Sequence, residues 1–128
     1  MASDVKSEDS ENDFHGIRIG DCVQIMDQLG KDYRTILVLA KDGSHEALVE
    51  LMEYSHSGVF DGAASLTHSD VLLFLLEHLK DEPFNRALTS LTNDAANHIK
   101  RKLLVTAEDR FKKKFPKTFN MEIKTPEK

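Results

Sequence analysis

Apolar residues fill positions 71 to 76 without a break, and this is the densest hydrophobic run in the chain. Thr67 and Asp70 precede it with capping-box spacing, in which each side chain can satisfy a free backbone amide of the first helical turn. A helix that is apolar all round is buried on most sides. The run is too short and too closely flanked by polar residues to cross a membrane. We therefore predict a buried central helix over 67–80, with the rest of the chain packed around it.

Four further segments show the spacing of a helix with one buried face, because their apolar residues recur three and four positions apart. Most of them start at a cap-forming residue and stop at glycine or proline. They run from Asp21 to Gly30, from Ser44 to Gly58, from Pro83 to Leu91 and from Thr92 to Phe115, where Pro116 follows. Phe14 to Ile19 alternates loosely between apolar and other residues, which indicates an extended segment.

Residues 33–40 can be interpreted in two ways. The run from Thr35 to Leu39 is short, is β-branched at three positions and is followed by the turn signal Lys41-Asp42-Gly43. These features favour a short buried strand, but periodicity alone cannot distinguish a short apolar run in a strand from one in a helix. The expected fold class is therefore mainly α: a compact domain of about five helices around 67–80, with at most a small β element near 33–40.

The chain of 128 residues is long enough for one domain with a single core. Residues 1–13 contain almost nothing that could be buried, so we predict a disordered acidic tail there. The helical domain is expected over 14–116 and a flexible C-terminal tail over 117–128. The first twenty residues contain no apolar leader, and the single cysteine, Cys22, cannot form an internal disulfide. Both features favour an intracellular protein of the nucleus or cytoplasm.

Signatures of catalysis and metal binding are missing from the sequence. The six histidines lack the paired spacing of a zinc site, and the nearest candidate, Asp94 with His98, is typical of a simple polar pair one helical turn apart. Glycine spacings of phosphate-binding loops are also absent. We therefore expect no enzyme, no metal and no cofactor. An enzyme with a histidine-based site would require a pocket that gathers at least two of four residues: His45, His56, His68 and His78.

Charge is distributed unevenly along the chain. Residues 1–99 contain 7 Lys and Arg against 18 Asp and Glu, whereas residues 100–128 contain 10 against 4. A basic segment with interleaved phenylalanines can hold nucleic acid by phosphate attraction and base stacking. The alternative is a solvated basic face that neutralises the acidic part of the same chain. The candidate nucleic-acid residues are Lys100, Arg101, Lys102, Arg110, Lys112, Lys113, Lys114 and Lys117.

The order of elements from Thr35 to Leu104 resembles the C-terminal part of the BTB/POZ family. Glu50 to Gly58 resembles the end of a helix that closes in a glycine turn, Val71 to Leu76 the next buried helix, and Phe84 to Leu91 the one after it. His56 and Ser57 stand where the family has an aromatic residue and threonine, and no N-terminal strands of the dimerising kind precede Gly20. The resemblance implies an adaptor that dimerises and docks another protein without catalysis.

The expected function is protein–protein interaction, as a small adaptor or subunit of an intracellular complex that could also associate with itself. The alternative is a nucleic-acid-binding module that uses the basic segment 100–117. Apolar residues recur every four positions on the last predicted helix, from Ile99 through Ala107 to Phe115, which is more apolar surface than one face of a small fold needs. We therefore expect partner or dimer contacts at the four large residues of this series, with burial in the chain's own core as the alternative. The four are Ile99, Leu103, Phe111 and Phe115.

Overall fold

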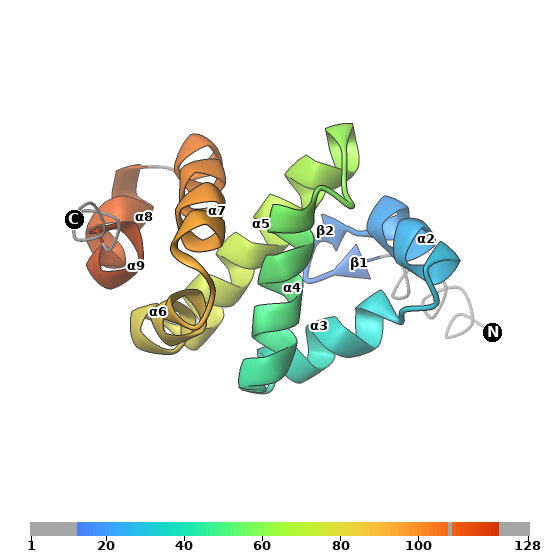
Figure 1. The fold of residues 1–128 in the computed structure, drawn as a ribbon, viewed down its shortest axis with the longest axis horizontal. Coiled ribbons are helices and arrows are strands. Elements are labelled where there is room, and N and C mark those ends of the chain that lie inside the picture. The colour runs from blue at the N-terminus through green and yellow to red at the C-terminus, as the bar shows by residue number, and fades with distance from the viewer. Residues whose placement is uncertain (1–12, 108, 121–128) are drawn as a thin grey trace.

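Helices make up most of the structure, which is a computed structural model that describes residues 13–107 and 109–120. Within these two stretches, eight helices follow one short antiparallel hairpin (Figure 1). The strands are β1 (Asp13–Phe14) and β2 (Ile17–Arg18). The helices are α2 (Gly20–Gln28), α3 (Tyr33–Lys41), α4 (His45–Ser57), α5 (Gly62–Leu79), α6 (Asp81–Thr89), α7 (Asn93–Thr106), α8 (Asp109–Lys114) and α9 (Pro116–Asn120). The prediction of a mainly α fold is confirmed.

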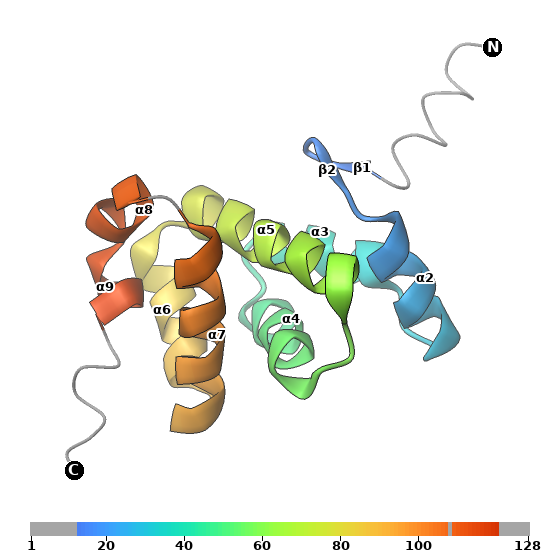
Figure 2. The ribbon, with the colours of Figure 1, turned by 90° about the horizontal axis from the view of Figure 1, so that it is seen from above.

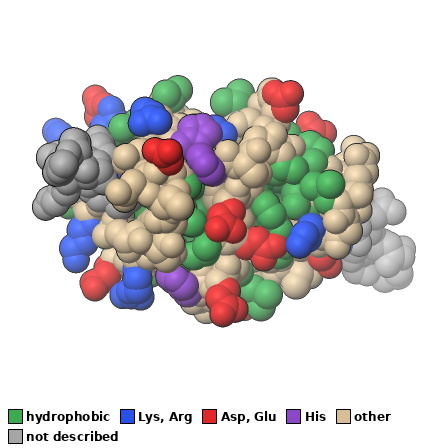
Figure 3. Space-filling model, viewed as in Figure 1, with side chains coloured by type: hydrophobic (Ala, Val, Ile, Leu, Met, Phe, Trp, Pro, Cys, Tyr) green, Lys and Arg blue, Asp and Glu red, His purple; other side chains and the backbone are tan. Residues whose placement is uncertain are grey.

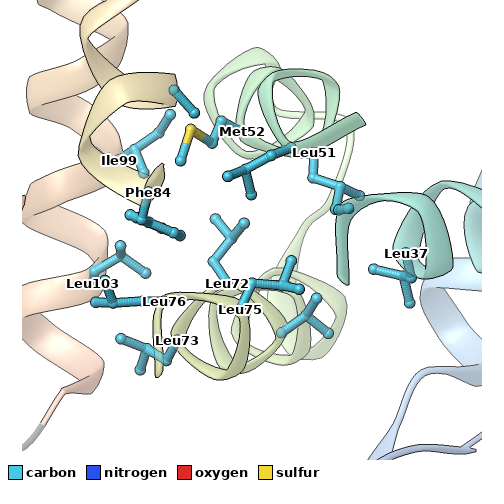
Figure 4. Packing of buried hydrophobic residues seen from close by; sticks show 14 of the residues in the cluster. Leu37, Leu51, Met52, Leu72, Leu73, Leu75, Leu76, Phe84, Ile99 and Leu103 are labelled. Carbon is cyan, nitrogen blue, oxygen red and sulfur yellow. The ribbon is translucent and has the colours of Figure 1, made fainter. Parts of the chain in front are cut away.

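Helix α5 is the centre of the fold, as its continuous apolar run predicts. It packs against α2, α3, α4, α6, α7 and strand β2. The view from above shows α5 passing between the hairpin on one side and α4 on the other (Figure 2). Leu72, Leu75 and Leu76 are fully buried, and they point into the space between α4, α6 and α7 (Figure 4).

The predicted start of this helix is wrong by five residues. Helix α5 begins at Gly62, with Asp61 in an extended conformation before it, so Thr67 lies inside the helix. The segment 62–66 consists largely of small residues, which gave no clear signal for a helix start. Alanine is nevertheless the strongest helix former, and Ala64 is buried against the core. The helix ends where expected, at Leu79, because Lys80 turns the backbone to a φ of 81°.

Residues 33–41 form helix α3, so the preference for a strand in this segment was wrong. Asp32 starts the helix: its Oδ1 accepts a hydrogen bond from the Thr35 amide at 3.1 Å. Tyr33, Leu37 and Ala40 are fully buried on the inner side. The unbroken run from Ile36 to Leu39 hid this pattern, because its outward-facing members are also apolar.

Several predicted helix ends are confirmed. Ser44 Oγ accepts a hydrogen bond from the Ala47 amide, and Thr92 Oγ1 accepts one from the Ala95 amide, each at 3.1 Å. Gly58 closes α4 with a φ of 83°, a value that glycine adopts without the strain that a Cβ would add. Helix α2 starts at Gly20, so the expected cap at Asp21 was wrong.

The long helix expected up to Phe115 is interrupted, so that prediction was wrong. Helix α7 ends at Thr106 because Ala107 has an extended ψ of 146°. Pro116 opens α9 instead of ending a helix, in agreement with the preference of proline for a first helical position. The Asp81 carboxylate, on α6, accepts hydrogen bonds from the amides of Lys117 at 2.7 Å and Thr118 at 2.9 Å. It therefore caps α9 from another part of the fold.

The domain boundaries shift at both ends. Asp13 belongs to β1, and the rest of the predicted N-terminal tail lies outside the described residues. Phe14 to Arg18 form the hairpin, which confirms the extended segment expected there. The predicted C-terminal tail starts too early, because Thr118 and Phe119 of α9 are buried. The remainder of that tail, 121–128, lies outside the described residues.

Candidate functional site

The predicted partner contacts on the last helices face the chain's own core. Ile99 and Leu103 are fully buried, and Phe115 is 2% exposed. In Figure 4, Ile99 and Leu103 point toward Phe84 and Leu76. Phe111, at the edge of the core, is partly buried. The structure therefore supports the alternative of internal burial, and we do not propose Ile99, Leu103 or Phe115 as partner contacts.

Much of the basic segment is engaged within the chain. Lys100 is buried, and Lys102 Nζ donates a hydrogen bond to the Ser55 carbonyl at 3.1 Å. Three further lysines form ion pairs with carboxylates. The pairs are Lys112 with Asp109 at 3.3 Å, Lys114 with Glu77 at 3.4 Å, and Lys117 with Glu82 at 3.8 Å. The pairs of Lys114 and Lys117 with carboxylates of the acidic part agree with the self-neutralisation given as the alternative, whereas Lys112 pairs within the basic segment.

The remaining members of the basic segment give no continuous binding surface. Arg101 and Lys113 are exposed, and the side chain of Arg110 lies outside the described part of the chain. Phe115 is buried, so it cannot stack on a base without leaving the core. Nucleic-acid binding by residues 100–117 stays a prediction, and the geometry of the described residues adds no support to it.

A buried polar network at the centre of the molecule joins α3, α4 and α5. The Tyr33 hydroxyl donates a hydrogen bond to His68 Nδ1 at 2.6 Å, and His68 Nε2–H donates to the Leu51 carbonyl at 2.7 Å. We assign this tautomer because a carbonyl can only accept. Burial lowers the pKa of His68 to about 4, so the ring is neutral at pH 7. With both nitrogens occupied, His68 acts as a structural link.

The ring of His68 is surrounded by aromatic residues. The centroids of Phe60 and Tyr33 lie 4.7 and 5.7 Å from it. Cys22 is buried nearby, and its thiol donates to the Ala64 carbonyl at 3.5 Å. Burial raises the pKa of Cys22 to about 11, which keeps the thiol protonated and poorly nucleophilic. Cys22 is therefore a small residue of the core.

The four histidines named for a catalytic site lie apart from one another, and the structure describes all of them. His45 begins α4 and His56 lies near its end. His68 is buried in α5, and His78 stacks on Phe74 at the far end of that helix with 5.7 Å between ring centroids. These positions do not bring the four histidines into one pocket.

The structure does bring two histidines together that the sequence separates by 42 positions. His56 Nδ1, on α4, lies 2.9 Å from His98 Nδ1, on α7. The two ring centroids are 5.1 Å apart and the ring planes meet at 73°. His56 is exposed and His98 is half-buried, so solvent reaches the pair. Sequence spacing gave no signal for this contact, because it depends on how α4 packs against α7.

Exposed apolar side chains gather at the end of the fold opposite α8 and α9. Four of the five large hydrophobic residues that are most exposed in the described chain belong to α3, the end of α2 or the start of α5, namely Leu29, Val38, Leu39 and Leu66. The fifth is Val105 on α7. Figure 3 shows hydrophobic side chains on the surface between α4 and α2, with charged side chains beside them.

Val38 and Leu39 are neighbours on the outer face of α3, where they are 52% and 48% exposed. Residues three and four apart adjoin on a helix surface, so this pair is bordered by Arg34, Thr35 and Asp42. We refer to these five residues as the α3 outer face. It is the candidate interaction surface, because no other helix of the described chain exposes two consecutive large apolar residues.

Comparison of the chain with protein-family models, curated proteins and solved structures finds no match. The candidate function therefore rests on the residues themselves. None of the helices in the described residues is long and apolar enough to span a membrane. The same residues contain no group of three or more His, Cys, Asp or Glu side chains placed to hold a metal ion.

Proposed function

We propose that the chain is a non-enzymatic protein–protein interaction module, a small adaptor or subunit of a complex, which docks its partner on the α3 outer face. The observation that carries this proposal is the exposure of Val38 and Leu39 on a helix whose inner side is fully buried. Burying both against a partner would remove apolar surface from water, at about 25 cal/mol per Å². The fold leaves about half of each of these two side chains in contact with water.

The charge around this surface defines the chemistry of the partner. Residues 13–66, which include α2, α3 and α4, contain 9 Asp and Glu against 4 Lys and Arg. A segment with a net acidic charge and an exposed apolar pair is complementary to an amphipathic partner segment that carries basic residues at its edges. We therefore assign the α3 outer face to a basic, amphipathic segment of a partner protein. The resemblance to the BTB/POZ family stays a prediction, and this proposal does not depend on it.

The experiment compares affinity purification of three forms of the chain from native cells, followed by mass spectrometry. The forms are wild type, Leu39→Lys and the matched control Val105→Lys, which places the same charge on α7 at a residue that is 86% exposed. We expect a reproducible companion with wild type and Val105→Lys. Its recovery with Leu39→Lys should fall at least about tenfold, which corresponds to about 1.4 kcal/mol of binding free energy.

Light scattering of the three pure proteins shows whether the α3 outer face binds another protein or a second copy of this chain. A wild-type monomer that binds a companion through Leu39 supports the proposal as stated. A wild-type dimer that Leu39→Lys dissociates would keep the interaction function but replace the basic partner with a second copy. Companions recovered equally with all three forms, or a monomer with no reproducible companion, would contradict the proposal.

A further inference from the structure

The contact between His56 and His98 has an unusual composition for a surface contact. Two Nδ1 atoms at 2.9 Å can share a hydrogen bond only if one carries a proton and the other presents its lone pair. Moving that single proton to the outer Nε2 of its own ring leaves two lone pairs that face each other across 2.9 Å. Neutral imidazole nitrogens are the commonest metal ligands among protein side chains.

We propose that His56 and His98 together form a binding site for a divalent first-row transition metal ion, which both Nδ1 atoms coordinate while water completes the shell. The site is independent of the α3 outer face and does not rest on the proposed function. A bound ion would link the end of α4 to the middle of α7, two helices that already pack against each other.

The separation of the two nitrogens favours particular metals. Two metal–nitrogen bonds of about 2.05 Å place their nitrogens about 2.9 Å apart when they meet at a right angle, and about 3.3 Å apart at a tetrahedral angle. The observed 2.9 Å therefore matches adjacent positions of a square or octahedral shell. Imidazole ligands in that geometry are typical of Ni²⁺ and Cu²⁺.

Charged residues near the histidine pair have opposite effects on its affinity for a metal ion. The cations Lys102 and Arg101 lie near His98. The same cations repel a metal ion and reduce its affinity. Glu53 and Asp94 precede the two histidines by about one helical turn, where exposed carboxylates offset part of that charge. Two protein ligands amid these charges indicate a weak, exchangeable site.

The test is titration of the full, untagged chain with Ni²⁺ at pH 7.5 by calorimetry, because a histidine tag would bind the same ion. We expect one saturable site, which His56→Ala and His98→Ala each weaken at least about tenfold. His45→Ala is the matched control, since His45 is an exposed histidine at the opposite end of α4. It should leave the affinity unchanged. Circular dichroism checks that each variant is folded, and His56 is exposed enough that its replacement should not unfold α4.

Electron paramagnetic resonance with one equivalent of Cu²⁺ gives a second readout that counts the coordinated nitrogens. Wild type and His45→Ala should show coupling to two imidazole nitrogens, and each single variant of the pair should show one fewer. Absence of saturable Ni²⁺ binding would overturn the proposal. Affinity that persists in both His56→Ala and His98→Ala, or that falls equally in His45→Ala, would also overturn it.

Discussion

Helices α3 and α7 each contain six apolar residues, but α3 has nine residues and α7 has fourteen, so the apolar residues are spaced differently. On α7, Ile99 and Leu103 lie four positions apart and are both fully buried. On α3, the apolar residues from Ile36 to Leu39 are consecutive, and successive residues of an α-helix point about 100° apart. Four consecutive residues cannot all face the core, so Val38 and Leu39 remain exposed. The comparison shows that the spacing of apolar residues, more than their number, separates core from candidate interface.

The largest expected effect tests this difference with one substitution made in both helices. Leu103→Ala should lower the free energy of unfolding by about 3 kcal/mol, because it removes a fully buried side chain and leaves a cavity. Leu39→Ala should change the free energy of unfolding by no more than about 0.5 kcal/mol, because that side chain is already half in water. Urea denaturation of the two variants and wild type measures both values.

Equal losses in the free energy of unfolding for the two variants would contradict the comparison, because Leu39 would then have to contribute to the core. A small loss in the free energy of unfolding for Leu103→Ala would also contradict it, because Leu103 would then contribute little to the core. Fluorescence is a poor probe in this chain, which has no tryptophan. Far-ultraviolet circular dichroism follows the mainly helical fold directly.

The two helices also differ in what holds their inner sides. Helix α7 is held by buried apolar contacts and by solvent-accessible hydrogen bonds to α4, whereas α3 is tied to α5 by the buried hydrogen bond between Tyr33 and His68. Burial depresses the pKa of His68 to about 4, against an ordinary value of 6.5. Between these two values the unfolded chain binds a proton at this residue and the folded chain does not. Stability is therefore fully present above pH 6.5 and falls as the pH is lowered toward 4.

This difference predicts an acid-sensitive fold. The loss between pH 6.5 and 4 should reach about 3 kcal/mol from His68 alone. His98, whose pKa is also lowered, adds to the loss in the same direction. Urea denaturation at pH 7.0, 5.5 and 4.5 measures the slope. His68→Gln should be less stable at pH 7.0 but should show a flatter slope, whereas the control His45→Gln should keep the wild-type slope. Identical slopes in wild type and His68→Gln would refute this role of His68.

The parts of the fold that the sequence predicted depend on local signals. The run from 71 to 76 and the caps at Ser44 and Thr92 each depend on residues within a few positions of one another, and all are confirmed. The break at Ala107 was missed, because the regular spacing of apolar residues continues across it. In α3, outward apolar residues obscured the helical pattern.

Contacts between distant segments had no signal in the sequence. The His56–His98 pair joins residues 42 positions apart, and the Asp81 cap reaches residues 36 and 37 positions away. Both depend on the packing of whole helices, which local propensity does not encode. The α3 outer face was missed for a related reason: the interpretation as a buried strand assigned all its apolar residues to the core. The two candidate sites, the His56–His98 pair and the α3 outer face, are therefore the features that the sequence predicted least.

The smallest expected effect concerns the attachment of α9, at the C-terminal end of the described chain, to the core. Asp81→Ala removes the carboxylate that accepts hydrogen bonds from the Lys117 and Thr118 amides, and it should lower the free energy of unfolding by about 1 kcal/mol. Glu82→Ala is the matched control, because that exposed carboxylate forms only surface ion pairs with Arg86 and Lys117. The control should cost less than about 0.5 kcal/mol, and that cost should shrink as salt is added.

Hydrogen exchange at the Lys117 and Thr118 amides should accelerate in Asp81→Ala and stay slow in Glu82→Ala. Unchanged exchange in both variants would contradict a role for the cap, because apolar burial of Phe115 and Phe119 would then hold α9 without it.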